Sequence, residues 1–193
     1  STTGMMLAAS ALDLVTLYLG LELMALCSYV LVGVTRERPA SNEAAMKYFL
    51  LGSFASGILL YGAALAYGAA GSTRLSALGP ALIEAGPGGN PLLLIGLVLL
   101  AAGLAFKIAA VPFHAWVPDA YEGAPAPVAA FLAVGSKAAG FAALGRVALA
   151  AFSPQAPALP AMLAVLAGLS IAVGSVLALA QTNTVLADLR RLH

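Results

Sequence analysis

The chain has 193 residues, of which 62% are hydrophobic and 9% charged, and its formal net charge is +1. Soluble domains carry about 25% charged residues, so this composition excludes a water-soluble domain and predicts an integral, multi-pass membrane protein. The near-neutral charge leaves no basic face for phosphates, which excludes nucleic acid as a partner. The single cysteine excludes a disulfide framework and a thiolate metal site.

Apolar segments follow one another along the chain. Residues 3–12 are apolar but too short to span a bilayer, and we interpret them as the end of a helix whose start is missing. Five segments are long enough to cross: 14–34, 44–70, 91–111, 127–151 and 158–180. They are too long and too continuous for barrel strands, so the predicted fold is all-α, a polytopic transmembrane helix bundle.

Polar and proline-rich segments separate the spans. Residues 36–39 break the first run, and 41–43 are a candidate N-cap for the next helix. Residues 71–90 are predicted to be a loop with an interfacial turn, while 119–125 and 153–157 are predicted connections. Basic residues in short loops predict the orientation: one set lies on the side assigned to the cytoplasm and Arg74 on the other. The cytoplasmic set is Arg36, Arg38, Arg190 and Arg191.

All three lysines lie within predicted spans: Lys47, Lys107 and Lys137. An ammonium in hydrocarbon costs about 2.5–3.5 kcal/mol on the most lenient scale, so such residues indicate function. A desolvated lysine gives up its proton more readily than an arginine does, which is the chemistry of a proton relay. Glu22 is the only charge in its span.

At about 1.5 Å per residue, Glu22, Lys107 and Lys137 have similar depths and form a row in the membrane plane. Lys47 lies near the cytoplasmic end of its span, where it suits a proton inlet. Pro112 breaks the span of Lys107, and a broken helix is tolerated in a membrane only where protein or water surrounds it. His114 follows Lys107 by seven residues, so on an intact helix it would share nearly the same face and could shuttle protons.

Each of these residues also has a structural interpretation. Glu22 and Lys107 could form a static ion pair, Lys47 could extend to the interface, and His114 could belong to an aromatic belt. Four charged residues outside the row are expected to have structural roles. Asp13 is expected to cap a helix and Arg146 to extend to the interface, while Asp119 and Glu122 are expected to be solvated loop residues.

Five stretches of the sequence carry a family resemblance. They are LYLGLELMALCSYVLVG, EAAMKYFLLGSFASGILLYG, GLAFKIAAVPFHAWVPDAYEGAPAPV, SKAAGFAALGRV and LALAQTN. With them the chain resembles the antiporter-like membrane subunits of proton-pumping NADH:quinone oxidoreductase, respiratory complex I, and most closely the subunit N group. Subunits of Mrp-type cation/proton antiporters and of membrane-bound hydrogenases share parts of these stretches and remain the alternative.

The resemblance implies roles for individual residues. Glu22 is similar to the glutamate that pairs with the lysine of the family's broken helix, here Lys107. Lys47 and Lys137 resemble the lysines of the helices before and after it, and His114 the histidine at the break. The family moves protons, driven by quinone reduction elsewhere in the complex. NADH, flavin and the iron–sulfur clusters lie on other subunits, and quinone is handled by the complex, so no cofactor, metal or redox chemistry is expected in this chain.

The resemblance also implies partners and a location. The partners are the other membrane subunits of the complex and the lipid bilayer, and the location is a bacterial plasma membrane, with an organellar membrane as the alternative. The family builds each subunit from two inverted five-helix repeats. We expect 1–193 to be one proton-conducting domain truncated at both ends, holding the first repeat and the first helix of the second. A non-conducting structural fragment is the rival interpretation from another class.

Overall fold

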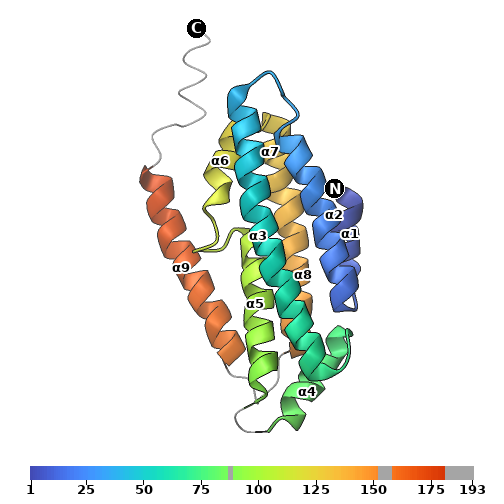
Figure 1. The fold of residues 1–193 in the computed structure, drawn as a ribbon. Helices are drawn as coiled ribbons and strands as arrows, with labels where there is room; N and C mark the ends of the chain where they lie inside the picture. Colours follow the sequence, from blue (N-terminus) through green and yellow to red (C-terminus); the bar gives the residue numbers. More distant parts are fainter. Residues whose placement is uncertain (87–88, 152–157, 181–193) are drawn as a thin grey trace.

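In a computed structural model the described residues, 1–86, 89–151 and 158–180, form an all-α bundle, which confirms the predicted fold class. Four of the long helices, α2, α3, α5 and α8, run side by side, and α9 flanks them (Figure 1). The short helix α4 lies at one end of the bundle, and α6 and α7 lie at the other (Figure 1). The elements are α1 (Thr2–Ser10), α2 (Leu14–Val32), α3 (Pro39–Ala70), η1 (Leu75–Ala77), α4 (Leu78–Glu84), α5 (Pro91–Ile108), α6 (Trp116–Gly123), α7 (Ala126–Phe131), η2 (Leu132–Ser136), α8 (Lys137–Ala151) and α9 (Ala158–Ala180).

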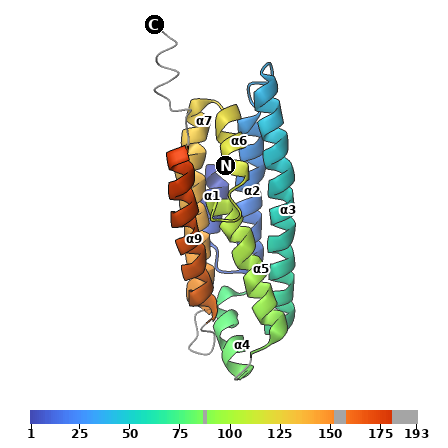
Figure 2. The same cartoon turned by 90° about the vertical axis from the view of Figure 1, so that its left-hand side faces the viewer.

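Four helical stretches in the described part of the chain are long and apolar enough to span a membrane. They are Leu14–Val32, Pro39–Ala70, Pro91–Ile108 and Ala126–Ala150, close to the first four predicted spans. The fifth, α9, is an apolar helix of 23 residues. Large apolar side chains such as Phe54 and Leu149 are exposed on the outer faces, as expected for contact with lipid acyl chains. The chain is therefore a multi-pass integral membrane protein. Figure 2 shows α3 and α9 on opposite sides of the bundle.

The predicted start of one helix needs correction. Helix α3 begins at Pro39, because proline lacks the N–H that the first helical turn leaves unpaired. The predicted cap Ser41 therefore lies inside the helix, and its hydroxyl donates to the Val32 carbonyl oxygen at 2.7 Å. Asp13 caps α2 as expected, accepting from the Thr16 amide at 2.8 Å. The hydrogen bonds from Thr16 lower the pKa of Asp13.

The predicted loop 71–90 contains the short elements η1 and α4. Leu75, Leu78 and Leu82 are buried at helical spacing. This helical pattern was not predicted because the segment is rich in glycine and proline, which are typical of loops. Two backbone hydrogen bonds join this segment to the turn between α1 and α2: the Leu14 amide donates to Thr73 at 2.8 Å, and the Leu75 amide to Leu12 at 3.0 Å. The connections at this end of the bundle therefore stabilise one another.

Arg146 also caps a helix. Its guanidinium donates to the carbonyl oxygens of Ala9 and Ala11 at the end of α1. Of the four arginines predicted to mark the cytoplasmic side, Arg36 and Arg38 lie between α2 and α3, at the end of the bundle that holds α6. Arg190 and Arg191, like Gln181, lie outside the described residues.

The helices approach one another closely where glycines face each other. A methyl group added to Gly62 on α3 would lie 2.6 Å from the backbone nitrogen of Leu100 on α5, and one added to Gly96 would lie 2.8 Å from that of Ala66. Small residues allow such backbone contact in membranes.

We therefore expect Gly62→Ala to lower the free energy of unfolding by about 1–3 kcal/mol, because the added methyl overpacks the interface between α3 and α5. Gly57→Ala on the same helix is the matched control, since a methyl group there meets nothing within 4 Å. Thermal unfolding of the detergent-solubilised protein measures both. Equal effects of the two substitutions would contradict the close packing of α3 on α5.

Candidate functional site

The centre of the molecule holds a break between α5 and α6. Helix α5 ends at Ile108, Ala109 has a left-handed φ of 60°, and α6 begins at Trp116. Protein groups satisfy the backbone atoms that the break frees. The Val111 amide donates to the Ser170 hydroxyl of α9 at 3.0 Å, and the Trp116 indole donates to the Phe106 carbonyl at 3.0 Å. This environment meets the condition under which non-helical backbone is tolerated inside a membrane. In Figure 1 the connecting segment extends toward α9.

Lys107 lies in the last turn of α5, directly before the break, and is only 5% exposed. Its Nζ lies 3.8 Å from Oε1 of Glu22 on α2 and 3.5 Å from the hydroxyl oxygen of Ser56 on α3. The Ser56 hydroxyl in turn donates to the same Glu22 oxygen. The side chain of Glu22 is 22% exposed, so both charges are largely removed from solvent. The structure thus joins three helices through an ammonium, a hydroxyl and a carboxylate.

Ser56 is the functional candidate that the sequence analysis missed. It lies in the run GSFASG, inside one of the five stretches that carry the family resemblance, and the sequence analysis assigned it no role. A pattern in the sequence could have singled it out, because Tyr48, Gly52, Ser56 and Leu59 recur every three or four residues and therefore share one face of α3. All four are buried, whereas Ser53 of the same run is exposed.

Lys137 lies at the second irregularity, where the π-helical turn η2 passes into α8. Its half-buried side chain places Nζ 5.7 Å from the centre of the Tyr121 ring on α6. One turn further on, a methyl group added to Gly140 would lie 2.8 Å from Cγ2 of Ile108. The start of α8 therefore passes the end of α5, and Lys137 lies at the level of the helix break. Such π-helical turns are frequent at functional sites.

His114 lies within the break itself, between α5 and α6. Because α5 ends at Ile108, His114 and Lys107 are not on one continuous helix, and the shared face expected for an intact helix does not exist. The Nδ1 atom of His114 is buried and, within the described part of the chain, has no hydrogen-bond partner. Its ring is therefore available to bind a polar group in the break.

Lys47 has different surroundings. Its side chain is 46% exposed, and Nζ lies 2.8 Å from a carboxylate oxygen of Glu43 and 3.5 Å from one of Asp119. Asp119 and Glu122 lie on α6 and not in a loop, which corrects their expected position and gives Asp119 an ion-pair partner. Lys47 precedes Ser56 by nine residues, about 13.5 Å along the helix. The structure does not bring it to the buried pair.

The arrangement suits reversible proton binding. A carboxylate and an ammonium in a low-dielectric interior are strongly coupled, so the charge of one governs whether the other keeps its proton. The described residues contain no group of three His, Cys, Asp or Glu side chains that could hold a metal ion. Ionisable groups inside a membrane bundle, beside interrupted helices, are a recurring feature of ion-translocating membrane proteins.

Comparisons with known proteins identify the family of this membrane protein. The family model "NADH:quinone oxidoreductase/Mrp antiporter, TM" matches residues 11–187, so the chain belongs to this transmembrane family and the predicted resemblance is confirmed. A similar protein is NADH-quinone oxidoreductase subunit N of Trichlorobacter lovleyi, which is 51% identical over 183 residues. That alignment covers 95% of this chain and 38% of the relative.

Two solved structures are also similar. One is respiratory complex I from Thermus thermophilus with bound aureothin, which is 46% identical with a TM-score of 0.77, over 94% of this chain and 38% of that one. The other is the Mrp complex from Dietzia sp., which is 27% identical with a TM-score of 0.66, over 77% of this chain and 28% of that one. This chain therefore spans well under half the length of the proteins it matches.

The Ser56 hydroxyl is expected to stabilise the buried pair. We predict that Ser56→Ala lowers the free energy of unfolding by about 1.5–3 kcal/mol, the usual range for a hydrogen bond to a charged group. Ser53→Ala, one turn away on the exposed face, is the control and should change stability little. Chemical or thermal unfolding in detergent measures the difference. If Ser56→Ala left the free energy of unfolding unchanged, the hydroxyl would not stabilise the pair.

Proposed function

We propose that this chain forms one domain, 1–193, of a proton-translocating membrane subunit of NADH:quinone oxidoreductase. The observation that carries the proposal is the buried Lys107 ammonium, placed against Glu22 and Ser56 beside a helix break. An ammonium in this position is costly, so its presence indicates a functional role. The similarity to subunit N supports the choice of complex, and the bacterial relatives support a plasma-membrane location.

The proposed relay consists of Glu22, Lys107, His114 and Lys137, supplied at the cytoplasmic surface through Lys47. When Glu22 is ionised, it stabilises the Lys107 ammonium. When Glu22 takes up a proton, that stabilisation ends, and Lys107 releases its proton toward the break. His114 can receive the proton there, and Lys137 lies on the far side of the same break.

This chain supplies no redox chemistry in the proposal. Quinone reduction and NADH oxidation belong to other parts of the complex, and this chain needs no cofactor of its own. The other membrane subunits are its partners. The remainder of the proton path lies in the part of the relatives that this chain does not span, so we expect no proton flux from the chain reconstituted alone.

Replacing Lys107 tests the proposal. In the full-length subunit assembled in its complex, Lys107→Met should reduce proton pumping in proteoliposomes to the background level, because methionine cannot carry a proton. Lys107→Arg should do the same, since an arginine keeps its proton. Leu60→Met on the exposed face of α3 is the control and should pump normally. Normal pumping by the Lys107→Met complex would exclude the proposed role.

A cation/proton antiporter subunit is the second candidate, and the similarity to the Mrp complex favours it. Identity to that complex is lower than to complex I, 27% against 46%, so we rank it second. Replacing sodium ions in the transport assay separates the two functions. Transport by an antiporter should depend on sodium ions, whereas pumping by the oxidoreductase should be unchanged when sodium is replaced.

A further inference from the structure

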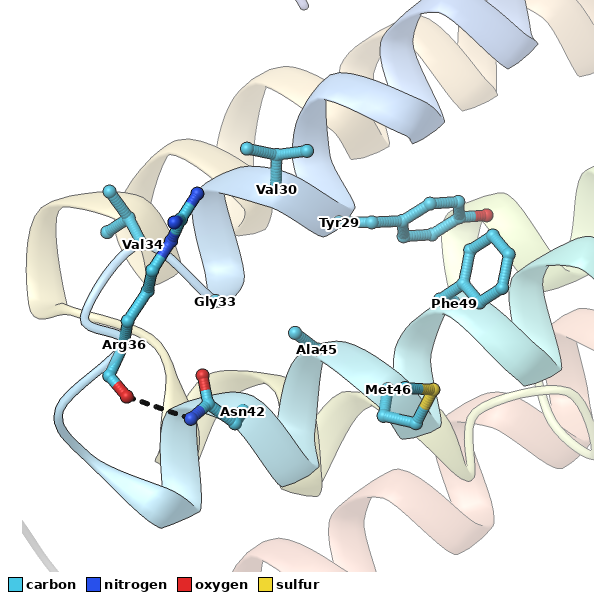
Figure 3. Close-up of a pocket in the computed structure, with 9 residues that line it drawn as sticks. All are labelled: Tyr29, Val30, Gly33, Val34, Arg36, Asn42, Ala45, Met46 and Phe49. Atoms are coloured by element: carbon cyan, nitrogen blue, oxygen red, sulfur yellow. Dashed lines mark hydrogen bonds between the residues drawn. The ribbon is translucent and has the colours of Figure 1, made fainter.

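The outer face of the bundle carries an open groove where α2 ends and α3 begins, and the proposed relay does not use it. The groove has a volume of about 560 Å³. Large apolar side chains form its walls: Val30 and Val34 come from α2, and Met46 and Phe49 from α3. All four are exposed. Figure 3 shows the two sets on opposite sides of the groove, with open space between them.

The groove is narrow because small residues form its floor. A methyl group added to Gly33 would lie 2.8 Å from Cβ of Ala45, so the backbones of α2 and α3 approach closely there. A helix with its side chains is about 10–12 Å across and could place only single side chains in such a groove. A hydrocarbon chain is one carbon wide, so it can lie along the floor in van der Waals contact with both walls.

Aromatic rings close the deep end of the groove. Tyr29 and Phe49 pack edge-on there, with their ring centres 5.7 Å apart. The Tyr29 hydroxyl points away from the groove (Figure 3) and rests against Gly52 of α3, where an added methyl group would overlap it. The deep end therefore presents ring carbons to an occupant and suits an apolar chain.

The mouth of the groove lies at the level of the lipid headgroups. Helix α2 has 19 residues and is about 28 Å long, close to the roughly 30 Å of the hydrocarbon core, so Val32 lies near the edge of that core. Arg36 follows four residues later and lies among the headgroups. Ala45 is level with Gly33 at the same edge, and Phe49 lies about 6 Å deeper along α3. The groove thus runs from the headgroups into the acyl chains.

Arg36 supplies a positive charge at the mouth. Its side chain is exposed and lines the groove, and Figure 3 shows it extending from the connection toward Val34 of α2. The Asn42 side chain donates to the Arg36 carbonyl oxygen at 2.9 Å, which holds this part of the connection against α3. Among the described residues the Arg36 guanidinium has no ion-pair partner, whereas the Lys47 ammonium has two. A guanidinium can bind a phosphate through two parallel hydrogen bonds.

We propose that this groove binds one phospholipid with an anionic headgroup, from the leaflet on this side of the membrane. The Arg36 guanidinium binds the phosphate, and one acyl chain enters the groove between Val30 and Met46. Glu37 and Arg38 follow Arg36 and offset one another, so the connection carries one net positive charge. Such a charge favours an anionic headgroup over a zwitterionic one. The site is separate from the proton relay and does not depend on it.

Photocrosslinking identifies the occupant in the full-length subunit, assembled in its complex in the native membrane. A diazirine amino acid in place of Met46 reacts on illumination with whatever fills the groove, and one in place of Leu60, on the exposed face of α3, is the control. Mass spectrometry should find phospholipid adducts at position 46. Their ratio of anionic to zwitterionic lipid should be about fivefold higher than at position 60. This factor corresponds to about 1 kcal/mol for one basic residue near an anionic surface.

Two results of this experiment would overturn the proposal. Adducts with polypeptide at position 46 would mean that a neighbouring subunit covers the groove. Equal lipid ratios at positions 46 and 60 would mean that the groove selects no headgroup and holds only bulk lipid.

Replacing Arg36 tests the headgroup contact. Arg36→Gln keeps a hydrogen-bond donor but loses the charge, so the lipid ratio at position 46 should fall to that at position 60. Arg38→Gln is the matched control, because Arg38 belongs to the same connection but does not line the groove, and it should leave most of the excess. An unchanged ratio in Arg36→Gln, or an equal loss in both variants, would overturn the site. Both arginines are exposed, so neither substitution is expected to impair folding.

Discussion

The structure depends on how one ammonium is kept inside an apolar bundle. Removing Lys107 from water costs several kcal/mol, and attraction to Glu22 recovers this only if further hydrogen bonds complete the geometry. Ser56 supplies the hydrogen bonds, so α2, α3 and α5 must meet at one point. A well-packed apolar residue would fill the same space with less cost, so stability alone does not explain the pair.

The two irregular segments follow from the same constraint. A regular helix presents no free polar backbone to its neighbours, whereas the break after Ile108 and the π-helical turn before Lys137 do. Each irregular segment directly adjoins a lysine. The hydrogen bonds of Val111 and Trp116 show that surrounding protein satisfies the freed backbone groups. The interior can thus be polar at one level of the membrane while the outer faces remain apolar.

Titratable and hydroxyl groups are also arranged by depth. Lys47 and Asp119 face the surroundings at the α6 end of the bundle. Tyr29 lies further along the seam between α2 and α3, and the pair of Glu22 and Lys107 lies beyond it. The exposed residues are already ion-paired, while the buried Tyr29 hydroxyl has no described partner.

The sequence by itself determined the membrane class, the approximate spans and the position of the helix break. These properties are local, because hydrophobic length and proline act within one segment. It did not predict α4, the pairing of Asp119 with Lys47, or the role of Ser56. It also could not show that Gly52 makes room for the Tyr29 hydroxyl. Those features depend on which face of each helix meets its neighbour, and only the packed tertiary structure decides that.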